Sequence, residues 1–226
     1  MTSVQSSLSK TERVLYVVLG GVMLAGVAIA AYDEQLYVTR FVPEDGLIEY
    51  ATACFLLLVA VMSVWRLAFN RTGKAVWFGI MMLFTAVLFL FGAGEEVSWG
   101  QRIFGFESTE FFQQNNGQAE TNLHNLVVGE TKINKIIFGQ LLTLVLVLYF
   151  LAGPVFYARS ERFQRLIDKF YIPAPQWHHA LGFGTVVLAT ILIASGKRAE
   201  LSEFGLSMLL FLVVWRPRNA VLFARG

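Results

Sequence analysis

The 226-residue sequence is 56% hydrophobic, has a mean hydropathy of +0.58 and carries a formal net charge of +2. This apolar excess is typical of membrane proteins and excludes an ordinary soluble domain. The single cysteine, Cys54, excludes an intrachain disulfide and a metal site built from several thiolates.

Six stretches of the chain approach the length of about 20 mostly apolar residues that a membrane-crossing helix needs. The sixth is short, and it spans only if Glu200 and Glu203 sit at the interface, near the positive end of the helix dipole. We therefore predict an all-α, polytopic transmembrane bundle that forms one integral membrane domain. The predicted spans are residues 14–31, 46–65, 75–94, 136–157, 177–194 and 201–215.

The charges between these spans predict the orientation of the bundle. If the N-terminus is cytoplasmic, the inner segments hold twelve of the eighteen Lys and Arg residues, as the positive-inside rule requires. Thirteen of the sixteen acidic residues then lie at or near the outer surface. We predict a multi-pass protein of the inner (plasma) membrane with both termini in the cytoplasm.

Several of the outer acids occupy positions that are costly for a carboxylate. Glu95 and Glu96 end the third span, where the helix dipole is negative and two adjacent carboxylates repel each other. Arg102, a bound metal, a cationic ligand or a proton would offset that cost. Glu49 lies about one turn inside the second span, and an ionisable group at that depth is a candidate functional residue.

The connection between the third and fourth spans, residues 95–135, is long for a membrane bundle. It is too apolar for a solvated tail, so we predict an interfacial or re-entrant element whose amide side chains satisfy its backbone. Glu120 and His124 are spaced i, i+4 within it. On a helix, this spacing suits shared metal ligation or a histidine base that a carboxylate orients, although a surface ion pair is the simpler interpretation.

These outer residues form one predicted polar site, in which each has an expected role. The candidate catalytic residues are Glu96, Glu120 and His124. The candidate ligands of a divalent metal are Glu95, Glu96, Glu120 and His124. The candidate substrate-binding residues are Glu49, Gln101, Arg102, Asn122 and Asn125. His178 and His179 fall at the opposite face and are interpreted as interfacial residues.

The string GEEVSWGQRIFGFES, at residues 94–108, is followed by ETNLHNL at residues 120–126. Together they resemble a signature of uncharacterised bacterial multi-span membrane proteins, and we expect that similarity to cover most of the chain. The resemblance implies a multi-span membrane fold and gives weight to the outer segment, but it implies no mechanism.

Three functions remain open at this point. The first is a hydrolase or transferase that acts on a lipid or lipid-linked substrate at the outer leaflet. The second is a cation or solute transporter or channel with an acidic vestibule, although no charged residue lies near the midplane of a predicted span. The third is a non-catalytic subunit of a membrane complex. Membrane lipids and other membrane-protein subunits are the expected partners, and nucleic acid is not.

Overall fold

The computed structural model describes residues 8–123, 125–128, 131–132 and 140–225. Within these ranges the chain is helical, as predicted, apart from one short antiparallel pair, β1 (Val127–Val128) and β2 (Thr131–Lys132). The principal helices are α1 (Lys10–Tyr32), α3 (Leu47–Phe69), α4 (Val76–Glu96), α7 (Leu142–Val147), α8 (Gly153–Arg159), α9 (Glu161–Lys169), α10 (Trp177–Leu192) and α11 (Arg198–Trp215). The short helices α2 (Glu34–Leu36) and η1 (Tyr37–Phe41) follow α1.

Four helices of the described chain are long and apolar enough to cross a membrane. They are α1, α3, α4 and the continuous helical stretch Leu142–Arg159. The helix α10 is apolar but has only 16 residues, and α11 has 18 residues with charges in its first turns. The bounds agree with the predicted spans to within a few residues, except that the start of the fourth predicted span, residues 136–139, lies outside the described residues.

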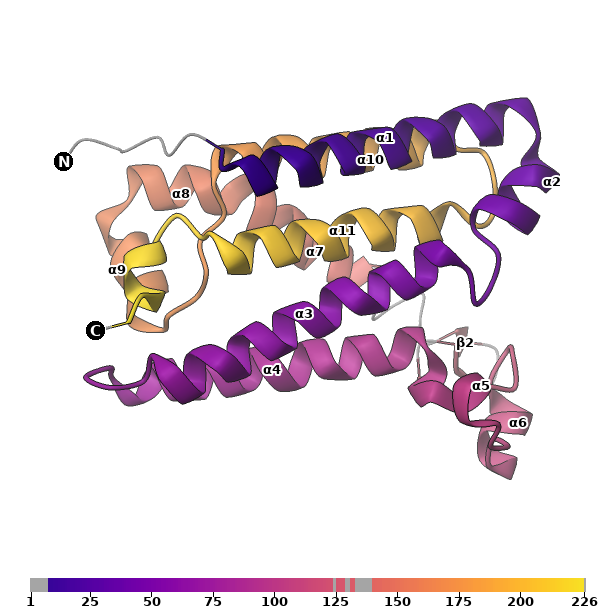
Figure 1. The fold of residues 1–226 in the computed structure, drawn as a ribbon, viewed down its shortest axis with the longest axis horizontal. Helices are drawn as coiled ribbons and strands as arrows, with labels where there is room; N and C mark the ends of the chain where they lie inside the picture. Colours follow the sequence, from indigo (N-terminus) through magenta and orange to yellow (C-terminus); the bar gives the residue numbers. More distant parts are fainter. Residues whose placement is uncertain (1–7, 124, 129–130, 133–139, 226) are drawn as a thin grey trace.

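The long helices run side by side as an elongated bundle with α11 at its centre (Figure 1). The helix α11 packs against α3 and α10, while α4 packs along the outer side of α3. The side chains of Leu209, Leu212 and Val213 on α11 are fully buried. At Gly205 a Cβ atom would lie 2.6 Å from a methyl carbon of Val186 and 2.8 Å from that of Met23, so three helices meet there only because the residue is glycine.

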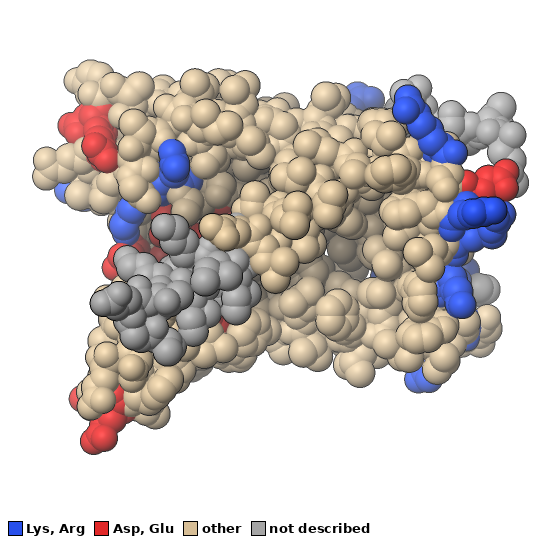
Figure 2. All heavy atoms as spheres, turned by 180° about the vertical axis from the view of Figure 1, so that it is seen from behind, with Lys and Arg blue, Asp and Glu red and all other residues tan. Residues whose placement is uncertain are grey.

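The bundle has two chemically different ends. The first described turn of α1 and the last described helix, η5 (Ala220–Phe223), lie together at what we call the terminal end (Figure 1). Basic side chains gather at this end, and acidic side chains gather at the other, which we call the acidic end (Figure 2). The surface between them is almost free of charge in this view, as expected for a belt that contacts lipid.

The fourth long helix contains a local widening next to a proline. Residues Leu148–Ala152 form a π-helical turn, η4, directly before Gly153 and Pro154. Proline lacks an amide hydrogen and its ring crowds the preceding turn, so the wider turn keeps the helix continuous. Phe150, in this π-helical segment, is fully buried, and its ring stacks on that of Phe183 of α10 at a centroid distance of 5.0 Å.

The chain leaves the bundle after α4. It passes through η2 (Ser98–Gly100), α5 (Gln101–Phe104) and α6 (Glu110–Asn115), which extend sideways from the acidic end (Figure 1). Five apolar side chains in this segment are exposed, and we call them the apolar platform. They are Trp99 (46%), Ile103 (61%), Phe104 (78%), Phe106 (42%) and Phe111 (55%).

Candidate functional site at the acidic end

The site begins at the last turn of α4, where the chain reverses through three left-handed residues. Ser98, Trp99 and Gly100 have φ values of 45°, 56° and 78°. Only glycine adopts this conformation without strain, so other contacts must hold the two side-chain residues there. The Trp99 indole supplies one: it covers Gly94, where a Cβ atom would lie 2.9 Å from the ring, and its Nε1 donates to Glu95 Oε1 at 2.9 Å.

Glu95 connects this turn to the amide-rich segment. Its side chain is 4% exposed, and its second oxygen, Oε2, accepts the Leu123 N–H at 2.6 Å. Both carboxylate oxygens therefore accept hydrogen bonds, which offsets the cost of an acid at a helix C-terminus. Arg102 was a candidate partner for the Glu95–Glu96 pair. The groups that donate to Glu95 in the structure are the Trp99 indole and the Leu123 main-chain amide.

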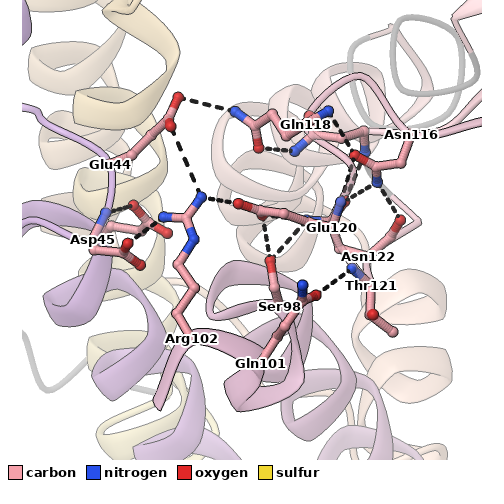
Figure 3. A network of polar contacts seen from close by, with 12 residues as sticks. Glu44, Asp45, Ser98, Gln101, Arg102, Asn116, Gln118, Glu120, Thr121 and Asn122 are labelled. Carbon is pink, nitrogen blue, oxygen red and sulfur yellow. Dashed lines mark hydrogen bonds and ion pairs between the residues drawn. The ribbon is translucent and has the colours of Figure 1, made fainter. Parts of the chain in front are cut away.

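Arg102 pairs with other carboxylates. Its guanidinium contacts Asp45 and Glu120, and it lies 3.9 Å from Glu44 (Figure 3). The acids Glu44 and Asp45 precede α3 in the chain, so this arginine joins the α2–α3 connection to the segment after α4. Glu44 also accepts from Lys197 Nζ at 3.1 Å, which brings in the loop before α11.

Glu120 is the buried centre of the same network, with 7% of its surface exposed. Besides the Arg102 contact, it accepts from the Ser98 hydroxyl at 2.5 Å and from Asn122 Nδ2 at 3.0 Å (Figure 3). Asn122 Nδ2 also donates to Ser98 Oγ at 2.9 Å. We call this set the polar clamp: Glu44, Asp45, Ser98, Arg102, Glu120 and Asn122.

The amide side chains around the clamp satisfy the backbone of the irregular segment. Gln101 Oε1 accepts from the Thr121 N–H at 2.8 Å and from the Ser108 hydroxyl at 2.9 Å. Asn116 Nδ2 donates to the main-chain oxygen of Asn122 at 2.9 Å. These bonds match the role expected of the amide-rich run, in which side chains replace the regular backbone partners of a helix.

Glu96, the neighbour of Glu95, lies near other acidic side chains. The carboxylates that act on it most strongly are those of Glu203 and Glu200 on α11 and Glu49 on α3. Glu49 lies in the first turn of α3, rather than a full turn inside the helix, and it accepts the Asp45 N–H at 2.8 Å. The two adjacent acids that end α4 therefore have different surroundings. Glu95 belongs to the hydrogen-bond network of the loop, and Glu96 lies among acids of the bundle.

Two expectations about the outer site need revision. Residues 120–123 are not helical, so the i, i+4 argument that placed Glu120 and His124 on one helical face is wrong. His124 itself lies outside the described residues. Asn125 is described, and its Nδ2 donates to Gln118 Oε1 at 2.7 Å. The oxygens of Glu95 and Glu120 are already bonded to protein donors, which makes them poor candidates for metal ligands.

A group with metal-ligand spacing occurs instead at the terminal end. Among the described residues, ligand atoms of Glu12, His178 and His179 all lie within 4.8 Å of one another. Glu12 is 1% exposed; one of its oxygens contacts Arg216 and the other lies 3.6 Å from His178 Nε2. We call these three residues the histidine cluster. The sequence did not reveal it, because no local pattern places the start of α1 beside the start of α10.

The protonation of His179 argues against metal binding in the histidine cluster. The Gln176 N–H donates to His179 Nδ1 at 3.0 Å, so Nδ1 carries a lone pair and Nε2 of the neutral ring carries the hydrogen. An Nε2–H group is a donor and not a ligand. Within the described part of the chain, the Nε2 atoms of both histidines, the Tyr16 hydroxyl and Glu12 Oε1 are buried without hydrogen-bond partners. This combination of donors and acceptors suits a small hydroxyl-bearing ligand such as water.

The chain matches no family model, no curated protein and no solved structure.

Proposed function

We propose that this protein is a six-span membrane protein that binds a lipid or lipid-linked substrate at the outer leaflet. The terminal end faces the cytoplasm, and the acidic end faces outward. The single observation that carries the proposal is the apolar platform: five exposed apolar side chains stand outside the helices that would span, next to the polar clamp. Side chains of this kind gain by entering the membrane interface, where indole and phenyl rings are enriched.

The packing of α10 and α11 supports six spans rather than four. The helix α11 lies at the centre of the bundle, between helices long enough to cross. Its 18 residues extend about 27 Å at about 1.5 Å per residue, close to the hydrocarbon thickness of about 30 Å. The two described ends of the chain share one end of the bundle, which supports an even number of crossings.

Reporter fusions test this topology. A reporter fused after Gly226 is expected to read cytoplasmic, and one inserted at Gly117, in the amide-rich segment, is expected to read extracytoplasmic. Both reporters on one side of the membrane would rule out the six-span arrangement.

The platform is tested by site-directed spin labelling in lipid nanodiscs. With Cys54 replaced by Ser, the chain has no native cysteine, so one label is placed at Phe104→Cys and a control at Glu107→Cys. Both positions are exposed and three residues apart. The label at position 104 should collide with oxygen dissolved in lipid, and the label at position 107 with a water-soluble nickel chelate. If both labels collided equally with the chelate, the proposal that the apolar platform enters the membrane would be refuted.

A second candidate function, a hydrolase or acyltransferase, is favoured by Ser98. A serine hydroxyl that donates to a carboxylate, as Ser98 does to Glu120, has a nearby proton acceptor, which a serine nucleophile needs. Its strained φ of 45° is a further feature of functional sites. Because Ser98 is 4% exposed, a substrate would reach it only after the clamp opens.

A fluorophosphonate probe, which traps activated serines, tests the second candidate. Mass spectrometry should find the probe on the peptide that contains Ser98, and Ser98→Ala should abolish this labelling. Ser108→Ala is the matched control, since Ser108 is a comparably buried serine of the same segment. The absence of probe from the Ser98 peptide would assign the Ser98–Glu120 bond a structural role alone.

A further inference from the structure

A cavity of about 590 Å³ opens at the terminal end, on the far side of the bundle from the polar clamp. It lies between the last turns of α3 and α11 and the short helix η5. Its lining includes Trp65, Arg66, Phe69, Asn70, Trp215 and Phe223. Arg225 also lines the cavity, so aromatic rings surround two arginines and one amide. None of these polar groups takes part in the proposed outer site.

Arg66 is a buried cation that has no anionic partner among the residues that the structure describes. It is 6% exposed, and no carboxylate lies within 4.0 Å of its guanidinium among the described residues. Its Nη2 donates to the Trp215 carbonyl at 3.3 Å, and its Cζ lies 4.8 Å from the Phe223 ring centroid. Its Nη1 is buried and has no hydrogen-bond partner in the part of the chain that the structure describes. A buried charge of this kind is costly unless something neutralises it.

Asn70 supplies the complementary observation. It is 5% exposed, and its Nδ2 donates to the Phe223 carbonyl at 2.7 Å, which fixes the orientation of the amide. Its Oδ1 therefore faces away from that bond, and none of the described residues donates a hydrogen bond to this buried oxygen. Both residues line the cavity, and each keeps one buried polar atom without a partner among the described residues: a donor on Arg66 and an acceptor on Asn70.

We propose that this cavity binds the headgroup of a phospholipid from the cytoplasmic leaflet. The phosphate pairs with Arg66, and a hydroxyl or ammonium group of the headgroup donates to Asn70 Oδ1. Trp65 and Phe69, which are 53% and 55% exposed, flank the cavity as interfacial side chains next to the glycerol and acyl chains. The two unused groups require both an anion and a donor, so phosphatidylglycerol and phosphatidylethanolamine fit, whereas phosphatidylcholine lacks the donor.

The wild-type protein provides the first test. Native mass spectrometry of the detergent-solubilised protein should show phosphatidylglycerol and phosphatidylethanolamine retained at lower added concentration than phosphatidylcholine. Glycerol 3-phosphate at equal concentration serves as the soluble source of the same phosphate chemistry, and it should not displace the lipid. Displacement by it would show that the site takes a soluble phosphate and would overturn the lipid assignment.

Matched variants give the second test. Arg66→Gln should weaken phosphatidylglycerol retention about tenfold or more, because a hydrogen bond to a charged group is worth about that factor. Arg71→Gln, which removes the same charge from an exposed position five residues on, should leave retention unchanged. Asn70→Ala should retain phosphate binding but lose the preference over phosphatidylcholine. Equal retention by Arg66→Gln and Arg71→Gln would refute the proposal.

A thermal measurement separates binding from a purely structural role of Arg66. In lipid-free detergent, Arg66→Gln removes an uncompensated buried charge, so its melting temperature should equal or exceed that of wild type. Added phosphatidylglycerol should then raise the wild-type melting temperature and leave that of the variant unchanged. The opposite result would be a variant that melts at a lower temperature than wild type in lipid-free detergent but shows the same rise in melting temperature on adding phosphatidylglycerol. That result would show that Arg66 only supports the fold.

Discussion

Replacing Glu120 by Gln should open the polar clamp locally while keeping the size of the side chain. The wild-type carboxylate accepts hydrogen bonds from Ser98, Asn122 and Arg102. In the glutamine variant, the side-chain NH2 group would stand opposite one of these three donors, and that hydrogen bond would be lost. A hydrogen bond to a charged group is worth about 1.5–3 kcal/mol. The Arg102 side chain is 35% exposed, so solvent reduces its ion pair to about 1 kcal/mol or less. We expect the free energy of local opening to fall by about 2–4 kcal/mol.

Hydrogen–deuterium exchange measures this opening directly. The Thr121 N–H donates to Gln101 Oε1, at the start of α5, at 2.8 Å, and the Leu123 N–H donates to Glu95 Oε2, at the end of α4, at 2.6 Å. A loss of 2–4 kcal/mol corresponds to exchange about 30- to 700-fold faster in the peptide that holds them. Glu107→Gln, at an exposed acid of the same segment, is the control and should exchange like wild type. Equal protection in the Glu120 and Glu107 variants would show that the clamp does not hold the segment.

Three further outcomes follow from the close contacts. Gly205→Ala should lower the melting temperature, since overpacking costs about 1–3 kcal/mol. Gly184→Ala is the control and should leave it unchanged, because a Cβ atom there meets no atom within 4 Å. Equal shifts in melting temperature for the two variants would contradict the three-helix contact at Gly205. Gly94→Ala should displace the Trp99 indole and change the near-ultraviolet circular dichroism, and an unchanged spectrum would contradict the packing. Zinc and EDTA should leave the melting temperature unchanged because His179 Nε2 carries a hydrogen, and a rise with zinc would disprove that tautomer.

The helices were predictable because hydrophobic length is a local property. Residues 46–65 and 75–94 were predicted as spans, and α3 and α4 occupy Leu47–Phe69 and Val76–Glu96. The differences lie at the ends, where polar residues continue a helix beyond its apolar part. Glu95 and Glu96 are consequently the last residues of α4 rather than the start of a loop.

The partners of the polar residues were not predictable, because they depend on distant segments. Arg102 was one of several groups that could have offset the charges of Glu95 and Glu96, but it contacts Asp45, 57 positions away in the chain. Ser98 carried no role in the sequence, since nothing local indicates a left-handed turn at a serine and a tryptophan. Glu12 gave no sign of lying beside His178, because hydropathy shows that α1 and α10 exist but not that they are neighbours.

The central position of α11 bears on how the protein is made. Its core residues Leu201, Leu209 and Leu212 are fully buried against helices that come earlier in the chain. The helices α1, α3 and α10 therefore leave the ribosome before the helix against which they pack. Until α11 arrives, α1, α3 and α10 have no shared core, and their inner faces must be shielded by lipid or by the insertion machinery. With Glu200 and Glu203 in its first turns, α11 is also poorly suited to insert alone, so the bundle should close in one late step.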